Sequence, residues 1–399
     1  MEWVDGGVTA PKGFRAAAAH AGVKYKRDDL ALLVSDQVAH VAGVFTTNRV
    51  QAAPVQLCRQ VVAGGVARAV LVNSGNANAL TGEQGWADAL ALQQEAARVL
   101  SLQAQQVAVC STGVIGVPLP MERLLPAIAP LAAALTSDGG TRFARAIWTT
   151  DTQLKQAALV FEVDGKRYTV GGAAKGSGMI HPNLATMLAF LTTDAALAPQ
   201  ALDALLRRAV KQSFHRISVD GDTSTNDTVL LLANGAAGGP VAQEGSTLYR
   251  ALEEALTALC ITLAKAIAQD GEGATKRIDA TVRGASSEEE AERAARAVIA
   301  STLVKAAVWG ADPNWGRVLS AMGASGVGFD LARLRLFMAG ECVFAEGKPT
   351  AYDERQLSAA MQGLVVPIVV DLGLGSSEAT CWGCDLTPEY VHINGSYRT

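Results

Sequence analysis

The chain has 399 residues, of which 34 are basic and 38 acidic, so its formal net charge is −4. Hydrophobic residues make up 49% of the chain and charged residues only 18%, a composition that excludes an intrinsically disordered protein. The chain is slightly acidic, so its net charge does not favour binding to nucleic acid or to an anionic membrane surface. Its 5% aromatic content also leaves few side chains on which bases could stack. We therefore expect a globular enzyme with neither partner.

The first residues are acidic and rich in glycine, without the basic and apolar regions of a signal peptide. Uncharged stretches such as residues 101–121 are interrupted by Gln, Gly and Pro and would not cross a bilayer as a helix. Cys381 and Cys384 form a C-x-x-C pair. A zinc site would need a second such pair or two histidines close by in the sequence, and neither is found there. We expect two buried structural thiols, no metal, and a cytoplasmic protein.

Apolar runs alternate with amphipathic stretches, as is typical of layered proteins with sheets and helices. In chain order, strands are predicted over residues 67–72, 107–110, 155–163, 167–170, 187–191, 228–232, 278–282, 334–343 and 365–370, and helices over 84–99, 200–210, 248–268 and 288–299. The turn Asp164-Gly165-Lys166 predicts a hairpin. Because some strands arrive as hairpins and others with helices between them, we expect an α/β (α+β) fold of mixed β-sheets flanked by helices. Residues 233–245, rich in Ala and Gly, are a candidate domain boundary.

Clusters of small polar residues interrupt the apolar strands. They span residues 73–78, 111–116, 149–152, 175–186, 221–228 and 271–276. A single cluster of this kind is most often a tight turn. Six of them, most at the end of a strand, predict a pocket lined by backbone N–H groups and hydroxyls. His181 and His215 lie beside two clusters, although histidines in such settings more often pack than contact a ligand.

Thr186 ends the fourth cluster and directly precedes an apolar strand. A threonine hydroxyl is a weak nucleophile and needs a base beside it. If the bond between Ala185 and Thr186 is cut, the new α-amine, with a reference pKa of about 7.7–8.0, supplies that base. The same hydroxyl could make the cut by attacking the Ala185 carbonyl, giving an ester that water hydrolyses. An ordinary threonine at a strand start is the alternative, and spacing alone leaves both interpretations open.

The segment from Lys175 to Phe190, Lys-Gly-Ser-Gly-Met-Ile-His-Pro-Asn-Leu-Ala-Thr-Met-Leu-Ala-Phe, resembles the signature of the ornithine acetyltransferase (glutamate N-acetyltransferase) family of arginine biosynthesis. Seven further motifs at matching separations carry the same resemblance. They span residues 73–78, 111–116, 149–152, 221–227, 312–317, 379–385 and 393–399. The resemblance therefore covers nearly the whole chain.

The resemblance implies a precursor that cleaves itself between Ala185 and Thr186. The products would be an α chain, residues 1–185, and a β chain, residues 186–399, which stay together as an α2β2 heterotetramer. It also implies acetyl transfer from N-acetylornithine to glutamate by a ping-pong route through acetyl-Thr186, with no cofactor. Bifunctional members also use acetyl-CoA as a donor, and the sequence does not separate them from monofunctional ones. The implied fold is the family's own arrangement of mixed sheets flanked by helices.

The resemblance also assigns roles to individual residues. Thr186 matches the nucleophile, with its freed amine as the base. Thr112 and Gly113 match the oxyanion-hole pair, a hydroxyl and a backbone N–H aimed at the developing alkoxide. The matching substrate-binding positions are Thr149, Lys175, Thr186, Glu272, Asn394 and Thr399. Among them, the Lys175 cation suits the α-carboxylate of an amino-acid substrate, and the Glu272 carboxylate suits an ammonium group. The position of the last two predicts an ordered C-terminal tail.

Two other functions use parts of the same pattern. An amidohydrolase or aminopeptidase would employ the Thr186 nucleophile but pass the acyl group to water. A non-catalytic amino-acid-binding protein would keep an uncut chain, and Thr186→Ala would leave its ligand binding and processing unchanged. Dependence of the reaction on glutamate separates the transferase from the hydrolase.

Overall fold

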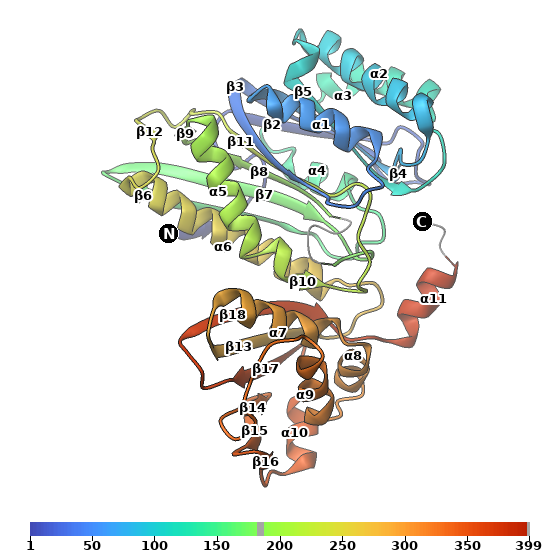
Figure 1. The fold of residues 1–399 in the computed structure, drawn as a ribbon. Helices are drawn as coiled ribbons and strands as arrows, with labels where there is room; N and C mark the ends of the chain where they lie inside the picture. Colours follow the sequence, from blue (N-terminus) through green and yellow to red (C-terminus); the bar gives the residue numbers. More distant parts are fainter. Residues whose placement is uncertain (182–186, 397–399) are drawn as a thin grey trace.

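The structure, a computed structural model, describes residues 1–181 and 187–396. Two mixed β-sheets, each covered by helices, lie one above the other in the view of Figure 1. This arrangement confirms the α/β (α+β) architecture of mixed sheets flanked by helices that the sequence predicts.

The larger sheet has nine strands within the described residues. They are β1 (Glu2–Val4), β2 (Phe14–Ala19), β3 (Leu30–Phe45), β4 (Val66–Asn76), β5 (Val107–Val114), β6 (Gln156–Val163), β7 (Lys166–Lys175), β8 (Leu188–Thr193) and β11 (Thr228–Ala233). Their order is β1-β6-β7-β8-β11-β3-β4-β5, with β2 paired to β3. β8 runs parallel to β11 and β4 runs parallel to β5, whereas the other neighbours are antiparallel.

Helices cover this sheet. They are α1 (Ala53–Ala63), α2 (Gly82–Leu100), α3 (Met121–Ala133), α4 (Gly140–Ala146), α5 (Pro199–Lys211) and α6 (Thr247–Gln269), with a 3-10 turn η1 (Ala104–Gln106) before β5. α5 and α6 share a core with β7, β8 and β11, and α2 and α3 share another with β2 to β5. The helical spacing of buried residues such as Leu202, Leu205 and Leu206 gives α5 its apolar face.

Strand β8 is buried on both faces, which explains its continuous apolar sequence. Ala189 and Leu191 enter the core beneath α5 and α6, whereas Leu188 and Phe190 enter the core on the opposite face, where Phe190 packs edge-on against Phe143 of α4. The segment that begins at Met187 is therefore fixed in the middle of the larger sheet.

The smaller sheet has seven strands in the described part of the chain, in the order β10-β18-β13-β17-β14-β15-β16. They are β10 (Ile217–Ser218), β13 (Arg277–Ala285), β14 (Arg335–Met338), β15 (Glu341–Ala345), β16 (Lys348–Pro349), β17 (Val365–Asp371) and β18 (Ser377–Cys384). Helices α7 (Glu288–Ala300), α8 (Thr302–Trp309), α9 (Trp315–Gly323) and α10 (Glu354–Ala360) accompany it. β10 follows the 3-10 turn η2 (Phe214–Arg216) and lies in the chain between β8 and β11, so the chain passes between the sheets and ties them together.

Helix α11 (Pro388–Ser396) follows the last strand and lies at the side of the molecule, near the level at which the two sheets adjoin (Figure 1). The far end of the sequence is thus brought back to the level of the junction between the two sheets.

Two predictions from the sequence are wrong. Residues 334–343 do not form one strand, because Ala339 and Gly340 have φ values of 46° and 90° and turn the chain into the β14–β15 hairpin. Residues 233–245 do not divide domains: β12 (Val241–Ala242) within them pairs with β9 (Ala196–Leu197), and the flanking elements β11 and α6 share one core. The remaining predicted strands, the hairpin at Asp164 and the predicted helices are confirmed within a few residues.

The two cysteines of the C-x-x-C pair are buried in β18, at 0% exposure for Cys381 and 1% for Cys384, as predicted. The Lys305 ammonium group lies 3.4 Å from Cys384 Sγ, and burial raises the pKa of both thiols. Within the described residues, every helix is too short or too polar to traverse a bilayer.

Candidate active site

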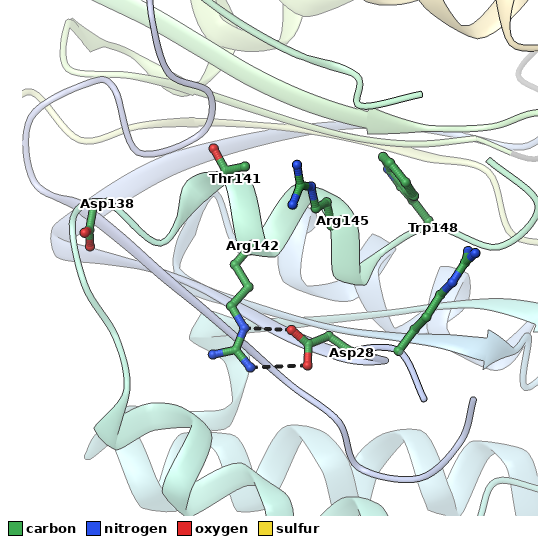
Figure 2. Close-up of a pocket in the computed structure, with 7 residues that line it drawn as sticks. Asp28, Asp138, Thr141, Arg142, Arg145 and Trp148 are labelled. Atoms are coloured by element: carbon green, nitrogen blue, oxygen red, sulfur yellow. Dashed lines mark hydrogen bonds and ion pairs between the residues drawn. The ribbon is translucent and has the colours of Figure 1, made fainter. Parts of the chain in front are cut away.

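Two of the cavities in the described residues differ in character. The larger, about 830 Å³, lies beside α4 and is lined by Arg27, Asp28, Asp138, Arg142, Arg145 and Trp148, among others (Figure 2). Its Arg142 guanidinium is already bound to the Asp28 carboxylate at 2.7 and 3.2 Å. The smaller cavity, about 180 Å³, is where the polar clusters of the sequence meet, and it is the candidate active site.

Five of the six polar clusters contribute to this smaller cavity, called the cleft below. Its lining consists of Thr112, Gly113, Thr149, Thr150, Lys175, Gly178, Met179, Asp220, Asp222, Glu272, Tyr390 and Asn394. They come from the end of β5, the loop after α4, the end of β7, the loop before β11, the loop after α6, and helix α11. The sixth cluster, residues 73–78, lies on β4 beside β5. Segments distant in sequence thus meet in one cleft.

Lys175, the last residue of β7, is the buried cation of the cleft and is 1% exposed. Its Nζ donates to Thr149 Oγ1 at 2.9 Å and to Thr112 Oγ1 at 3.3 Å. Burial lowers the pKa of this ammonium group, while the Asp151 carboxylate acts in the opposite direction. Because both hydroxyls accept a hydrogen bond from the lysine, each keeps its own proton for donation to another group in the cleft.

Gly113 follows Thr112 at a place where only glycine fits. Its φ is +135°, and an added β-carbon would overlap the backbone of Gly75 on the neighbouring strand β4. Both residues of the pair line the cleft. A hydroxyl and a backbone N–H on consecutive residues are the donors from which an oxyanion hole is built.

Glu272 supplies a negative charge opposite the lysine and is 7% exposed. Its backbone N–H donates to the Ser177 carbonyl at 2.9 Å, and its Oε2 accepts from Asn394 Nδ2 at 2.8 Å. Gly178 lies so close to this carboxylate that an added β-carbon would overlap it. Since Asn394 belongs to α11, the hydrogen bond fixes the C-terminal helix to the cleft.

A buried ion cluster supports the cleft from behind. Lys155 Nζ donates to Asp151 Oδ1 at 2.7 Å, and both side chains are fully buried. Asp151 also accepts from the N–H groups of Gly176 at 2.7 Å and Thr149 at 3.0 Å. Burial alone would raise the pKa of Asp151, but the ammonium groups of Lys155 and Lys175 outweigh it and lower the pKa to about 2. The cluster therefore fixes the backbone on both sides of the contact between Thr149 and Lys175.

Replacing Lys155 with methionine is expected to lower the free energy of unfolding by about 3–5 kcal/mol, because the carboxylates of Asp151 and Asp270 then lose their shared buried cation. The matched control Lys211→Met removes only an exposed ion pair with Glu289 and should cost less than about 1 kcal/mol. Urea unfolding of both variants measures the difference. Equal stabilities would contradict the supporting role of the cluster.

Two residues of the cleft, Asp220 and Tyr390, were not predicted from the sequence. Asp220 accepts the N–H groups of Met179, at 2.5 Å, and of the next residue, at 2.8 Å, and so holds Met179 at a φ of 56°. Tyr390 lines the cleft from α11, and burial together with Asp220 raises the pKa of its phenol. Two signals were available: Asp220 directly precedes a polar cluster, and Tyr390 lies one helical turn before Asn394.

The predicted site residues Thr112, Gly113, Thr149, Lys175, Glu272 and Asn394 meet in this one cleft. Ala185, Thr186 and Thr399 lie outside the described residues. Lys175 pairs with Leu188 across β7 and β8, so residue 186 is two positions along the chain from the partner of the buried cation.

Neither His181 nor His215 is among the described residues that line the cleft. His181 Nδ1 lies 3.1 Å from Ser218 Oγ, and His215 lies in η2. Burial and the Arg296 guanidinium lower the pKa of both rings, to about 4 for His215. The two histidines therefore pack against neighbouring elements, as such residues were expected to do.

Fold and cleft together define a class of protein: an α/β protein whose strand ends form a small polar site with a buried cation, a carboxylate and hydroxyl donors. Such a site suits a substrate of amino-acid size. The model of the ArgJ family matches residues 15–399. The chain belongs to the ArgJ family.

Curated relatives match the chain over its full length. The arginine biosynthesis bifunctional protein ArgJ of Symbiobacterium thermophilum is 54% identical over 402 residues, which cover 100% of both chains. The protein of the same name from Caldanaerobacter subterraneus is 47% identical over 403 residues, again covering 100% of both. The crystal structure of the Bacillus halodurans ArgJ protein is 39% identical, with a TM-score of 0.51, and covers 52% of this chain and 98% of the solved one. These findings confirm the family predicted from the sequence.

Proposed function

We propose that the chain is a glutamate N-acetyltransferase that moves the acetyl group of N-acetylornithine to glutamate through an acetyl ester of Thr186. Its family makes it an acyltransferase of arginine biosynthesis. One observation carries the finer proposal: Lys175, Glu272 and the pair Thr112–Gly113 line one small cleft. N-acetylornithine presents an α-carboxylate, a side-chain ammonium group and an acetyl carbonyl oxygen, and the cleft offers a counterpart to each.

Charge complementarity assigns the substrate's groups to the cleft. Lys175 is the cation for the α-carboxylate, and Thr149, whose hydroxyl accepts from Lys175, donates its own proton to the same group. Glu272 binds the ammonium group of the ornithine side chain, and Asn394 holds the Glu272 carboxylate in place. Thr399 is the remaining proposed substrate contact. The buried positions of Lys175 and Glu272 strengthen both interactions because water is excluded.

The proposed cut between Ala185 and Thr186 would leave both products in one sheet. β7 of the first product pairs with β8 of the second, and β3 of the first pairs with β11 of the second. These ladders support products that stay associated as α chain, residues 1–185, and β chain, residues 186–399. The solved Bacillus halodurans chain matches only 52% of this one over 98% of its own length, which is the size of one such product. An α2β2 assembly in the cytoplasm completes the proposal.

In the first half-reaction the Thr186 hydroxyl attacks the acetyl carbonyl of N-acetylornithine while its α-amine takes the hydroxyl proton. The Thr112 hydroxyl and the Gly113 N–H stabilise the oxyanion. The carbon–nitrogen bond then breaks, the proton passes to the departing amine, and ornithine leaves behind the acetyl ester. The amine of glutamate attacks this ester in the second half-reaction, and its proton returns to the Thr186 hydroxyl as N-acetylglutamate forms. Acetyl-CoA can load the same ester as an alternative co-substrate, and the proposal involves no cofactor.

Incubation of the purified enzyme with N-acetylornithine, with and without glutamate, tests the proposal. Ornithine release should rise severalfold when glutamate is added, with N-acetylglutamate formed at the same rate, because the incoming amine competes with water for the ester. Initial rates at several fixed glutamate concentrations should give the parallel double-reciprocal lines of a ping-pong route. Release of ornithine and acetate at a rate independent of glutamate would identify an amidohydrolase instead.

A further inference from the structure

The segment directly before β11 connects the two sides of the cleft. Asn226 and Asp227 occupy it and are 4% and 0% exposed. Neither is among the residues that line the cleft, so neither contacts substrate in the proposed reaction. Their side chains instead reach two different strands of the larger sheet.

Asn226 holds the strand that carries the oxyanion-hole pair. Its Nδ2 donates to the carbonyl oxygens of Ser111, at 2.8 Å, and Ala77, at 2.7 Å, and its Oδ1 accepts from Thr225 Oγ1 at 2.6 Å. Both amide protons and the amide oxygen are therefore used. The Ser111 carbonyl belongs to the peptide group whose N–H is that of Thr112. This contact therefore fixes the orientation of the backbone from which the pair projects.

Asp227 holds the strand that follows the proposed nucleophile. Its Oδ1 accepts from the Met187 N–H at 3.0 Å, and its backbone carbonyl accepts from the Thr46 N–H at 3.0 Å. The other carboxyl oxygen, Oδ2, is buried and has no hydrogen-bond partner among residues 1–181 and 187–396. Burial raises the pKa of this carboxyl well above its usual range. A buried carboxyl oxygen without a hydrogen-bond partner costs stability.

We propose that Asn226 and Asp227 are positioning residues that set the distance between the Thr112–Gly113 pair on β5 and Met187, the residue that follows the proposed nucleophile in the chain. Because they are adjacent in the chain, the two sides of the cleft cannot move apart without breaking one of the two contacts. A displacement of about 1 Å in a reacting group can cost about 10²-fold in rate. The inference rests on the proposed acetyl transfer and adds to it the residues that hold its reacting groups in register.

The variant Asn226→Ser tests the inference against a matched control. Asn234 lies directly after β11, at the opposite end of the strand, is 6% exposed, and makes the same kind of contact: its Nδ2 donates to the Lys12 carbonyl at 3.0 Å and lies 3.3 Å from Ser35 Oγ. Asn226→Ser should lower kcat by about 10²-fold and leave KM for N-acetylornithine and glutamate within about twofold. Asn234→Ser should lose comparable thermal stability but keep the kcat of the parent enzyme. Rates are referred to the cleaved fraction, measured by denaturing electrophoresis.

The variant Asp227→Ala removes the carboxyl oxygen that accepts from the Met187 N–H, and provides a second test that does not depend on how well Asn226→Ser folds. It should also lower kcat with little change in KM, and the double variant should be hardly slower than the slower single one, since both side chains maintain one spacing. A kcat for Asn226→Ser or Asp227→Ala equal to that of Asn234→Ser, or a raised KM with an unchanged kcat, would overturn the positioning role alone. A parent enzyme without glutamate-dependent transfer would overturn the proposed function, and the positioning role with it.

Discussion

Replacing Thr186 with alanine is expected to leave a single uncut chain that transfers no acetyl group. The variant lacks the hydroxyl that makes the cut and carries the acetyl group, and without the cut it also lacks the α-amine that serves as base. Loss of a nucleophile lowers kcat on the order of 10⁶-fold in enzymes that work through a covalent intermediate. Denaturing electrophoresis measures the cut, and formation of N-acetylglutamate measures the transfer.

The matched control is Thr186→Ser, which keeps both a hydroxyl and, after cleavage, an α-amine. It should be cut and should transfer acetyl groups, more slowly than the parent enzyme. Cleavage or transfer by Thr186→Ala at the parent rate would show that another group is the nucleophile.

Removing the hydroxyl of Thr112 is expected to lower kcat by about 10²–10³-fold with little change in KM. This hydroxyl accepts from Lys175 Nζ at 3.3 Å, so its own proton is free for the oxygen that gains charge during acyl transfer. That charge exists in the transition state and not in the bound substrate. Removing the hydroxyl therefore lowers kcat and leaves KM nearly unchanged. Steady-state kinetics of Thr112→Ala with both substrates measures the effect.

Two further variants control for changes in the buried lysine. Thr112→Ser keeps the hydroxyl and should restore most of the rate. Thr149→Ala removes the other hydroxyl that accepts from Lys175, at 2.9 Å, and should raise KM more than it lowers kcat, because Thr149 is proposed to contact the substrate. A raised KM with an unchanged kcat in Thr112→Ala would assign Thr112 to substrate binding and not to the oxyanion hole.

Elements with one uninterrupted period were predictable from the sequence, and elements that break their period were not. β8 is continuously apolar because it is buried on both faces, and α5 has a regular helical pattern because it buries one constant face. β3 was missed because its pairing with β4 shifts register between Val34 and Ala39, where Asp36 and its neighbours are exposed and interrupt the apolar pattern. α3 was missed because Pro126 and Pro130 lie inside it.

The chemistry of the cleft was visible in the sequence, but its assembly was not. Polar clusters at strand ends predict the pocket locally, whereas the roles of Thr112 and Lys175 were implied by the family resemblance. The contact of Glu272 with Asn394 joins residues 122 positions apart and depends on the return of α11, which no local pattern encodes. Asp220 and Tyr390 were missed although each lies beside a predicted cluster or residue, because their places in the cleft also depend on contacts between distant segments.

Denaturing mass spectrometry of the freshly purified protein, with N-terminal sequencing of each species, is the most direct test of self-cleavage before Thr186. Cleavage before Thr186 should give two chains of 185 and 214 residues, about 19 and 22 kDa when the total of 41.4 kDa is divided in proportion to length. The larger chain should begin Thr-Met-Leu-Ala, with Thr186 first. A single chain of 41.4 kDa in a preparation that transfers acetyl groups would remove the α-amine base and contradict the mechanism.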